Sequence, residues 1–116
     1  IGPYAGGFRF NNVAIPPGSH ISSAYLKLTQ YTSYNSPAVS LKVAADDVDN
    51  SPTFSDAASG PLNRTLTTAQ VDWDIPVWTG DQQYSSPDIK SVIQEVVDRG
   101  GWSSGNSLSV IVACDD

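Results

Sequence analysis

The sequence predicts an all-β domain, a β-sandwich or a barrel, with one short amphipathic helix at about residues 87–99 that is packed on an end or an edge. Short segments with alternating apolar and polar residues recur along the chain, and turn-forming residues (nine Gly and eight Pro) separate them. A single segment has the 3.6-residue period of a helix. With 116 residues, 40% of them hydrophobic, the chain is long enough for one domain with its own core, spanning residues 1–116.

The strands are predicted from the two-residue period of a half-buried strand. Ala24, Leu26 and Leu28 alternate with polar residues, and Trp73 lies between two aspartates, which places it on the core face. A Thr-rich stretch and a final apolar run complete the set. The predicted strands are residues 7–13, 21–29, 39–44, 64–68, 71–75 and 107–114.

The helix is predicted from its end signals and from one apolar stripe. Ser86 suits the N-cap position, Pro87 the first helical position, and Gly100 the residue after the C-terminus. The stripe has helical spacing and is made of Ile89, Val92, Ile93, Val96 and Val97. We expect Trp102, which follows the Gly-Gly stop, to join the helix to the last strand.

The charge balance excludes some partners. Six Lys+Arg against twelve Asp+Glu give a net charge of −6, which argues against nucleic acid and anionic membranes as partners. No apolar run approaches the ~20 residues of a membrane span. Cys114 has no second cysteine to pair with and is expected to be a small buried residue. The chain begins at Ile1 without a methionine, and we expect it to be a piece of a longer protein.

Catalytic patterns are not found. Glu95 is the single glutamate and lies on the polar side of the helix, which indicates solvent or a local ion pair as its surroundings. The single histidine, His20, lies in a turn. The sequence has no nucleophile elbow, phosphate-binding loop or zinc pattern. We therefore expect a protein that is not an enzyme, and a small hydrolase ranks last among the functions considered.

An acidic loop is the candidate metal site. Asp46, Asp47, Asp49 and Asn50 follow a predicted strand within five residues. Carboxylate and amide oxygens suit a hard cation such as Ca²⁺, although the spacing is not that of an EF-hand. The alternative is a solvated acidic loop with Asx turns.

Aromatic residues in loops are the candidate ligand-binding residues. Tyr31 and Tyr34 lie at a strand end and in a loop, Trp78 lies beyond another strand end, and Tyr84 lies just before the helix. Flat rings stack on the apolar faces of sugars, and polar neighbours bind the hydroxyl groups.

Two segments carry a resemblance to a known family. They read RFNNVAIPPGSHISSAYL and PDIKSVIQEVVDRGGWSSGN, and each joins turn residues to a fixed apolar phase. The chain resembles the DNRLRE-type bacterial extracellular β-sandwich domains over nearly its whole length. The resemblance implies a jelly-roll-like antiparallel β-sandwich. It also implies a non-catalytic module, sometimes with Ca²⁺. On matching positions it implies Asp46, Asp49 and Asn50 as metal ligands and Trp73 and Trp78 as the family's paired tryptophans. The stretch TGDQQYSSP lacks the family's usual Gly/Ala-rich lead-in.

Two functions remain open. The first is a carbohydrate-binding module of a secreted or cell-surface bacterial protein, which binds a polysaccharide or glycan through loop aromatics, with calcium as a structural ion. The second is a structural or assembly domain of a bacterial surface protein or extracellular filament, whose strand edges contact neighbouring domains or other copies of the chain.

Overall fold

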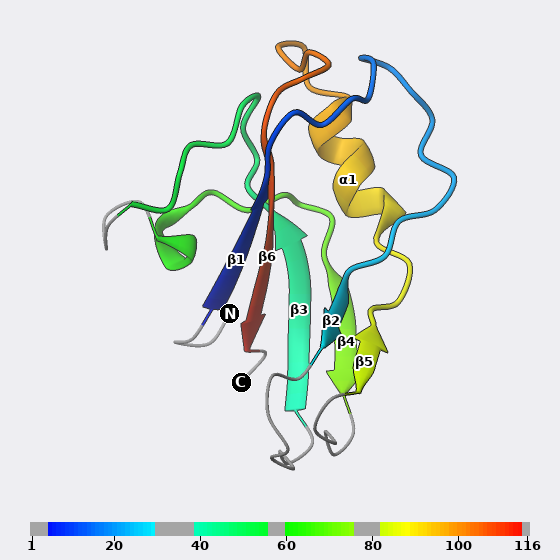
Figure 1. The fold of residues 1–116 in the computed structure, drawn as a ribbon, viewed down its shortest axis with the longest axis vertical. Coiled ribbons are helices and arrows are strands. Elements are labelled where there is room, and N and C mark those ends of the chain that lie inside the picture. Colours follow the sequence, from blue (N-terminus) through cyan, green and yellow to red (C-terminus); the bar gives the residue numbers. More distant parts are fainter. Residues whose placement is uncertain (1–4, 30–38, 56–59, 76–81, 115–116) are drawn as a thin grey trace.

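The predicted class is confirmed: the protein is an all-β, sandwich-like domain, and the part of the chain that the structure describes contains one short α-helix. The computed structural model describes residues 5–29, 39–55, 60–75 and 82–114, which form two antiparallel sheets and two helical elements (Figure 1). The elements are β1 (Ala5–Phe10), β2 (Lys27–Thr29), β3 (Val39–Ala45), the 3-10 turn η2 (Pro61–Asn63), β4 (Val71–Ile75), β5 (Gln83–Ser85), α1 (Lys90–Val97) and β6 (Leu108–Cys114).

The larger sheet has the strand order β1-β6-β3-β4, with every neighbouring pair antiparallel. Its second strand, β6, is buried from Leu108 to Ala113 because both of its faces are covered. A strand in that position needs an almost continuous apolar run, which LSVIVAC supplies. Cys114 at its end is half-buried, so the expectation of full burial is only partly met.

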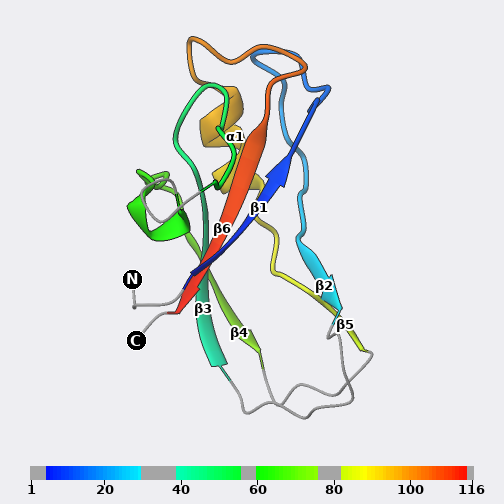
Figure 2. The same cartoon turned by 60° about the vertical axis from the view of Figure 1, so that its left-hand side comes forward.

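The smaller sheet pairs β2 with β5 and forms a second layer beside the larger one (Figure 2). The core lies between this layer, the helix and the inner face of the larger sheet. Trp73 is 4% exposed there, which confirms its predicted place in the core. The buried cluster also contains Leu26, Val43, Ala45, Ile75, Ile89, Val92, Ile93, Val96, Val97, Trp102, Leu108, Val110 and Val112.

The helix is shorter than predicted, Lys90–Val97 in place of residues 87–99. Ser86 is not its N-cap, because the Ser86 hydroxyl accepts a hydrogen bond from the Leu26 N–H at 2.9 Å. Asp88 caps the first turn instead, and its Oδ1 accepts the N–H groups of Lys90 and Ala24. The apolar stripe is correct, since its five residues are all buried against the core.

Several predicted strands are also shorter. The segment 7–13 is replaced by Ala5–Phe10, the segment 21–29 is a strand only at Lys27–Thr29, and the segment 64–68 forms a single bridge between Leu66 and Asp46. Residues 24–26 leave the ladder because their backbone groups bond to the turn before the helix, as in the 2.8 Å bond from the Ile89 N–H to the Ala24 carbonyl. The strand β5 was not predicted.

Candidate functional site

Asp46, at the end of β3, is a buried carboxylate paired with Arg64. Its Oδ2 accepts hydrogen bonds from Arg64 Nη1 and from the Ser51 hydroxyl, and its side chain is 1% exposed against 7% for Arg64. Arg64 Nη2 also donates to the carbonyls of Pro52 and Thr53. Asp46 Oδ1 is buried and has no hydrogen-bond partner among the described residues. The Arg64 side chain therefore organises the loop that Asp46 begins.

Asp47 and Asp49 share a second arginine, which comes from the end of the helix. Arg99 Nη1 lies 2.9 Å from Asp47 Oδ1, and Arg99 Nε lies 2.8 Å from Asp49 Oδ1. Hydrogen bonds to Asp49, which has the larger effect, and to Asp47 raise the pKa of Arg99 above its ordinary value. A cation whose pKa is raised by folding contributes stability below its unfolded-state pKa, and this contribution is lost as the pH rises through the folded-state pKa.

Asn50 also serves the fold. Its Oδ1 accepts the Ser107 N–H at 2.8 Å, and the Asn106 side chain donates to the Asp49 carbonyl at 3.1 Å. The Ser51 N–H bonds to the Ser107 carbonyl at 2.9 Å. Residues 46–51 are thus fastened to the turn that leads into β6, and we call them the acidic loop.

The calcium prediction concerns the same four side chains, Asp46, Asp47, Asp49 and Asn50. Across residues 5–29, 39–55, 60–75 and 82–114, no three His, Cys, Asp or Glu side chains are placed to hold a metal ion. Ca²⁺ takes six to eight oxygen ligands, whereas the three carboxylates here are directed at two guanidinium groups. Arg64 and Arg99 contact one oxygen of each of these carboxylates. Calcium binding stays a prediction from the sequence.

Gly101 tests the packing between the acidic loop and the turn after the helix. A Cβ at Gly101 would overlap the Asp49 carboxylate, whereas one at Gly100 would meet nothing within 4 Å. We expect Gly101→Ala to displace the half-exposed Asp49 side chain from Arg99. The free energy of unfolding should fall by up to about 1 kcal/mol, the usual contribution of a solvent-exposed ion pair. Urea denaturation measures this difference. Gly100→Ala is the matched control, and an equal loss in both variants would contradict the proposed contact.

Glu95 connects the helix to the segment before β4. Its two carboxylate oxygens accept the N–H groups of Thr68 and Ala69, both at 2.8 Å. The sequence indicated solvent or a local ion pair for this side chain, so the assignment was wrong. A lone glutamate on a helix gives no signal for backbone partners that lie 26 and 27 residues earlier.

The predicted ligand-binding aromatics are mostly not described. Tyr31, Tyr34 and Trp78 lie outside the described residues. Tyr84 lies on β5, is half-buried and packs against the core. The described residues that border these segments lie together at the end of the molecule away from the helix (Figure 1). They are two cross-strand pairs, Thr29 with Gln83 and Val39 with Ile75.

A shallow polar hollow lies beside the helix. Gln94 connects its two walls, because its Nε2 donates to the Ser19 carbonyl and its Oε1 accepts the Ile21 N–H, both at 2.8 Å. The hollow has a volume of about 430 Å³. It is lined by Gly18, Ser19, His20, Ile21, Lys90, Ser91, Gln94 and Asp98.

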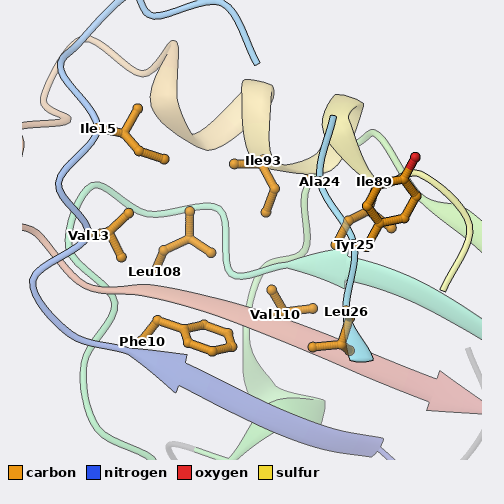
Figure 3. A pocket seen from close by; sticks show the side chains of 10 residues that line it. All are labelled: Phe10, Val13, Ile15, Ala24, Tyr25, Leu26, Ile89, Ile93, Leu108 and Val110. Carbon is orange, nitrogen blue, oxygen red and sulfur yellow. The ribbon is translucent and has the colours of Figure 1, made fainter. Parts of the chain in front are cut away.

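A second concavity is almost wholly apolar, and we call it the apolar groove (Figure 3). It has a volume of about 180 Å³ and opens between the segment after β1 and the segment before β2, with side chains from the helix and β6 behind it. Two of its aromatic residues are exposed, Phe10 at 46% and Tyr25 at 56%. Its lining is Phe10, Val13, Ile15, Ala24, Tyr25, Leu26, Ile89, Ile93, Leu108 and Val110. Sequence reasoning missed the groove, because alternation predicts which residues face inward but not how far the second layer of the sandwich extends over them.

Comparisons with known proteins do not assign a family. No family model matches the chain, and neither the curated proteins nor the solved structures contain a significant match. The resemblance to DNRLRE-type domains therefore stays a prediction. Among the described residues, no helix has the length and apolar character needed to cross a membrane.

Proposed function

We propose that this domain is a non-catalytic carbohydrate-binding module of a secreted or cell-surface bacterial protein. One observation carries the proposal. The strand ends that border both aromatic segments, Thr29 and Val39 around one and Ile75 and Gln83 around the other, lie together at one end of the sandwich. We propose that aromatic side chains from both segments act together there as a sugar-binding platform.

The chemistry of this end suits a neutral polymer. Stacking on an aromatic ring supplies apolar contact, and polar side chains supply hydrogen bonds to hydroxyl groups. The strand ends themselves carry Thr29 and Gln83, two uncharged polar residues. In addition, arginines or backbone N–H groups hold the carboxylates of Asp46, Asp47 and Glu95, which gives these side chains a structural role.

The test uses affinity electrophoresis against a panel of soluble polysaccharides. We expect retardation by at least one polymer, and we expect Tyr34→Ala and Trp78→Ala each to weaken it by about tenfold, equivalent to ~1.4 kcal/mol. Tyr25→Ala is the matched control, because Tyr25 is an exposed tyrosine in the apolar groove. Unretarded migration on every polymer, or equal loss in the control, would count against the proposal.

A second function has its own support. Phe10 is exposed at one end of the apolar groove, at the end of the edge strand β1, and Tyr25 is exposed at the other end, on the segment before β2. An extended segment of another protein can add to a free strand edge of this kind. We propose assembly with other protein segments as the alternative function of the domain.

A further inference from the structure

The apolar groove lies where the smaller layer of the sandwich stops short. Among the described residues, the larger sheet has four strands and the smaller sheet has two. The strands β2 and β5 and the helix cover only part of the larger sheet's inner face. Phe10, at the end of β1, is therefore 46% exposed although it pairs with the buried Leu108. A further strand beside β2 would cover the groove.

One edge of the β2 segment is already used. The Leu26 N–H donates to the Ser86 hydroxyl, the Leu26 carbonyl accepts the Ser86 N–H, and Leu28 pairs with Tyr84 on β5. In an extended chain, the backbone groups of alternate residues point to opposite edges. The N–H and C=O groups of Tyr25 and Lys27 therefore point to the other edge. No strand lies along that edge among the described residues.

The size of the exposed surface selects the occupant. At their exposed fractions, Phe10 and Tyr25 offer on the order of 100 Å² each. A stable globular dimer buries about 800 Å² on each partner. The groove is too small for the face of a second domain. A single extended strand needs less area, because it adds main-chain hydrogen bonds to contacts made by every second side chain.

We propose that the apolar groove is the docking site for an extended peptide strand of a partner protein, with apolar side chains at alternate positions. The strand pairs with the edge formed by Tyr25 and Lys27 and places its apolar side chains against Phe10, Val13 and Leu108. Adding it enlarges a two-stranded sheet, which is only marginally stable alone, to three strands. The proposal specifies the partner for the alternative function, assembly, and does not depend on carbohydrate binding.

The test is peptide binding followed by fluorescence anisotropy. The probe is a labelled synthetic peptide in which valine alternates with threonine between polar ends. The control probe has the same length, with proline in place of alternate valines, so that it cannot donate the ladder hydrogen bonds. We expect saturable binding of the first peptide and at least about tenfold weaker binding of the second. Equal binding of both peptides, or no saturable binding of either, overturns the proposal.

Variants locate the binding site. Tyr25→Asp and Phe10→Asp place a charge on the groove, and we expect each to weaken binding of the alternating peptide by about tenfold or more. Leu62→Asp is the matched control, since Leu62 is 53% exposed and lies outside the groove. Tyr25→Asp keeps the test informative if Phe10→Asp does not fold, because Tyr25 is the more exposed residue. An equal effect of Leu62→Asp overturns the proposal.

Self-association is measured separately by sedimentation. If the chain forms dimers that Tyr25→Asp abolishes, the groove belongs to a second copy and the partner-strand proposal is overturned. If the chain stays monomeric and binds the peptide, strand docking stands and assembly through identical copies fails. The two proposals are thereby distinguished.

Discussion

Arg64→Met is expected to lower the free energy of unfolding by about 3–5 kcal/mol, because it leaves the Asp46 carboxylate buried without its charge partner. Both side chains are almost fully buried, at 7% exposure for Arg64 and 1% for Asp46. The variant also loses the donors to the Pro52 and Thr53 carbonyls and the contact of the guanidinium with the Phe54 ring, 4.3 Å from its centroid. Urea denaturation with an unchanged m-value measures the loss.

The double variant Asp46→Leu, Arg64→Met is the control for this interpretation. When both charges are removed, no uncompensated ion remains, and apolar replacements of buried pairs are often tolerated. We expect the double variant to be more stable than Arg64→Met alone. If the single variant loses less than about 1 kcal/mol, Asp46 is not held by Arg64 in the way the structure indicates.

Trp102→Ala is expected to cost about 3–5 kcal/mol, the range for a large aromatic side chain removed from a core. Trp102 is 2% exposed, and its indole N–H donates to the Ile15 carbonyl at 2.8 Å. This hydrogen bond connects the turn after the helix to the segment after β1, whereas the sequence predicted a connection from the helix to the last strand. The loss is measured by urea denaturation.

Trp102→Phe separates packing from hydrogen bonding. Phenylalanine keeps much of the apolar volume but leaves the Ile15 carbonyl without its donor, which should cost about 1–3 kcal/mol. We expect this variant to lie between the parent protein and Trp102→Ala. Equal stability of the alanine and phenylalanine variants would show that the indole N–H, and not the packed ring, carries the effect.

Local patterns were predictable from the sequence because they depend on neighbouring residues. The apolar stripe of the helix and the alternation around Trp73 correctly assigned which side chains enter the core. The ends of the elements were not predictable. Ser86 has the chemistry of an N-cap, yet its hydroxyl bonds to Leu26, 60 residues away in sequence. Tertiary contacts of this kind decide where β2 begins and where the helix starts.

The acidic loop shows a second limit. A group of acidic residues close together in sequence has the same pattern whether it binds a metal ion or is solvated. What distinguishes them here is the position of two arginines, Arg64 and Arg99, of which Arg99 lies 52 residues from Asp47 and 50 from Asp49. No local pattern indicates those pairs. The composition offers one hint. The chain has six basic residues and twelve acidic ones, so each basic residue can be considered in turn as a partner for the acidic loop.

The apolar groove was also beyond sequence analysis. Leu26 was assigned an inward-facing position correctly, but alternation does not say how far a second layer extends over the larger sheet. Coverage depends on how many strands the smaller sheet has, and β5 was not predicted at all. The groove exists because the smaller sheet covers only part of the larger one, and this is a property of the assembled fold.

The most direct test of the proposed function is a nuclear magnetic resonance titration of the labelled domain with the polysaccharide that retards it most. The proposal predicts that shift changes concentrate at the amides of Thr29, Val39, Ile75 and Gln83, the strand ends that border the aromatic segments. Changes confined to His20 and Lys90 in the polar hollow, or to Phe10 and Tyr25 in the apolar groove, would contradict it.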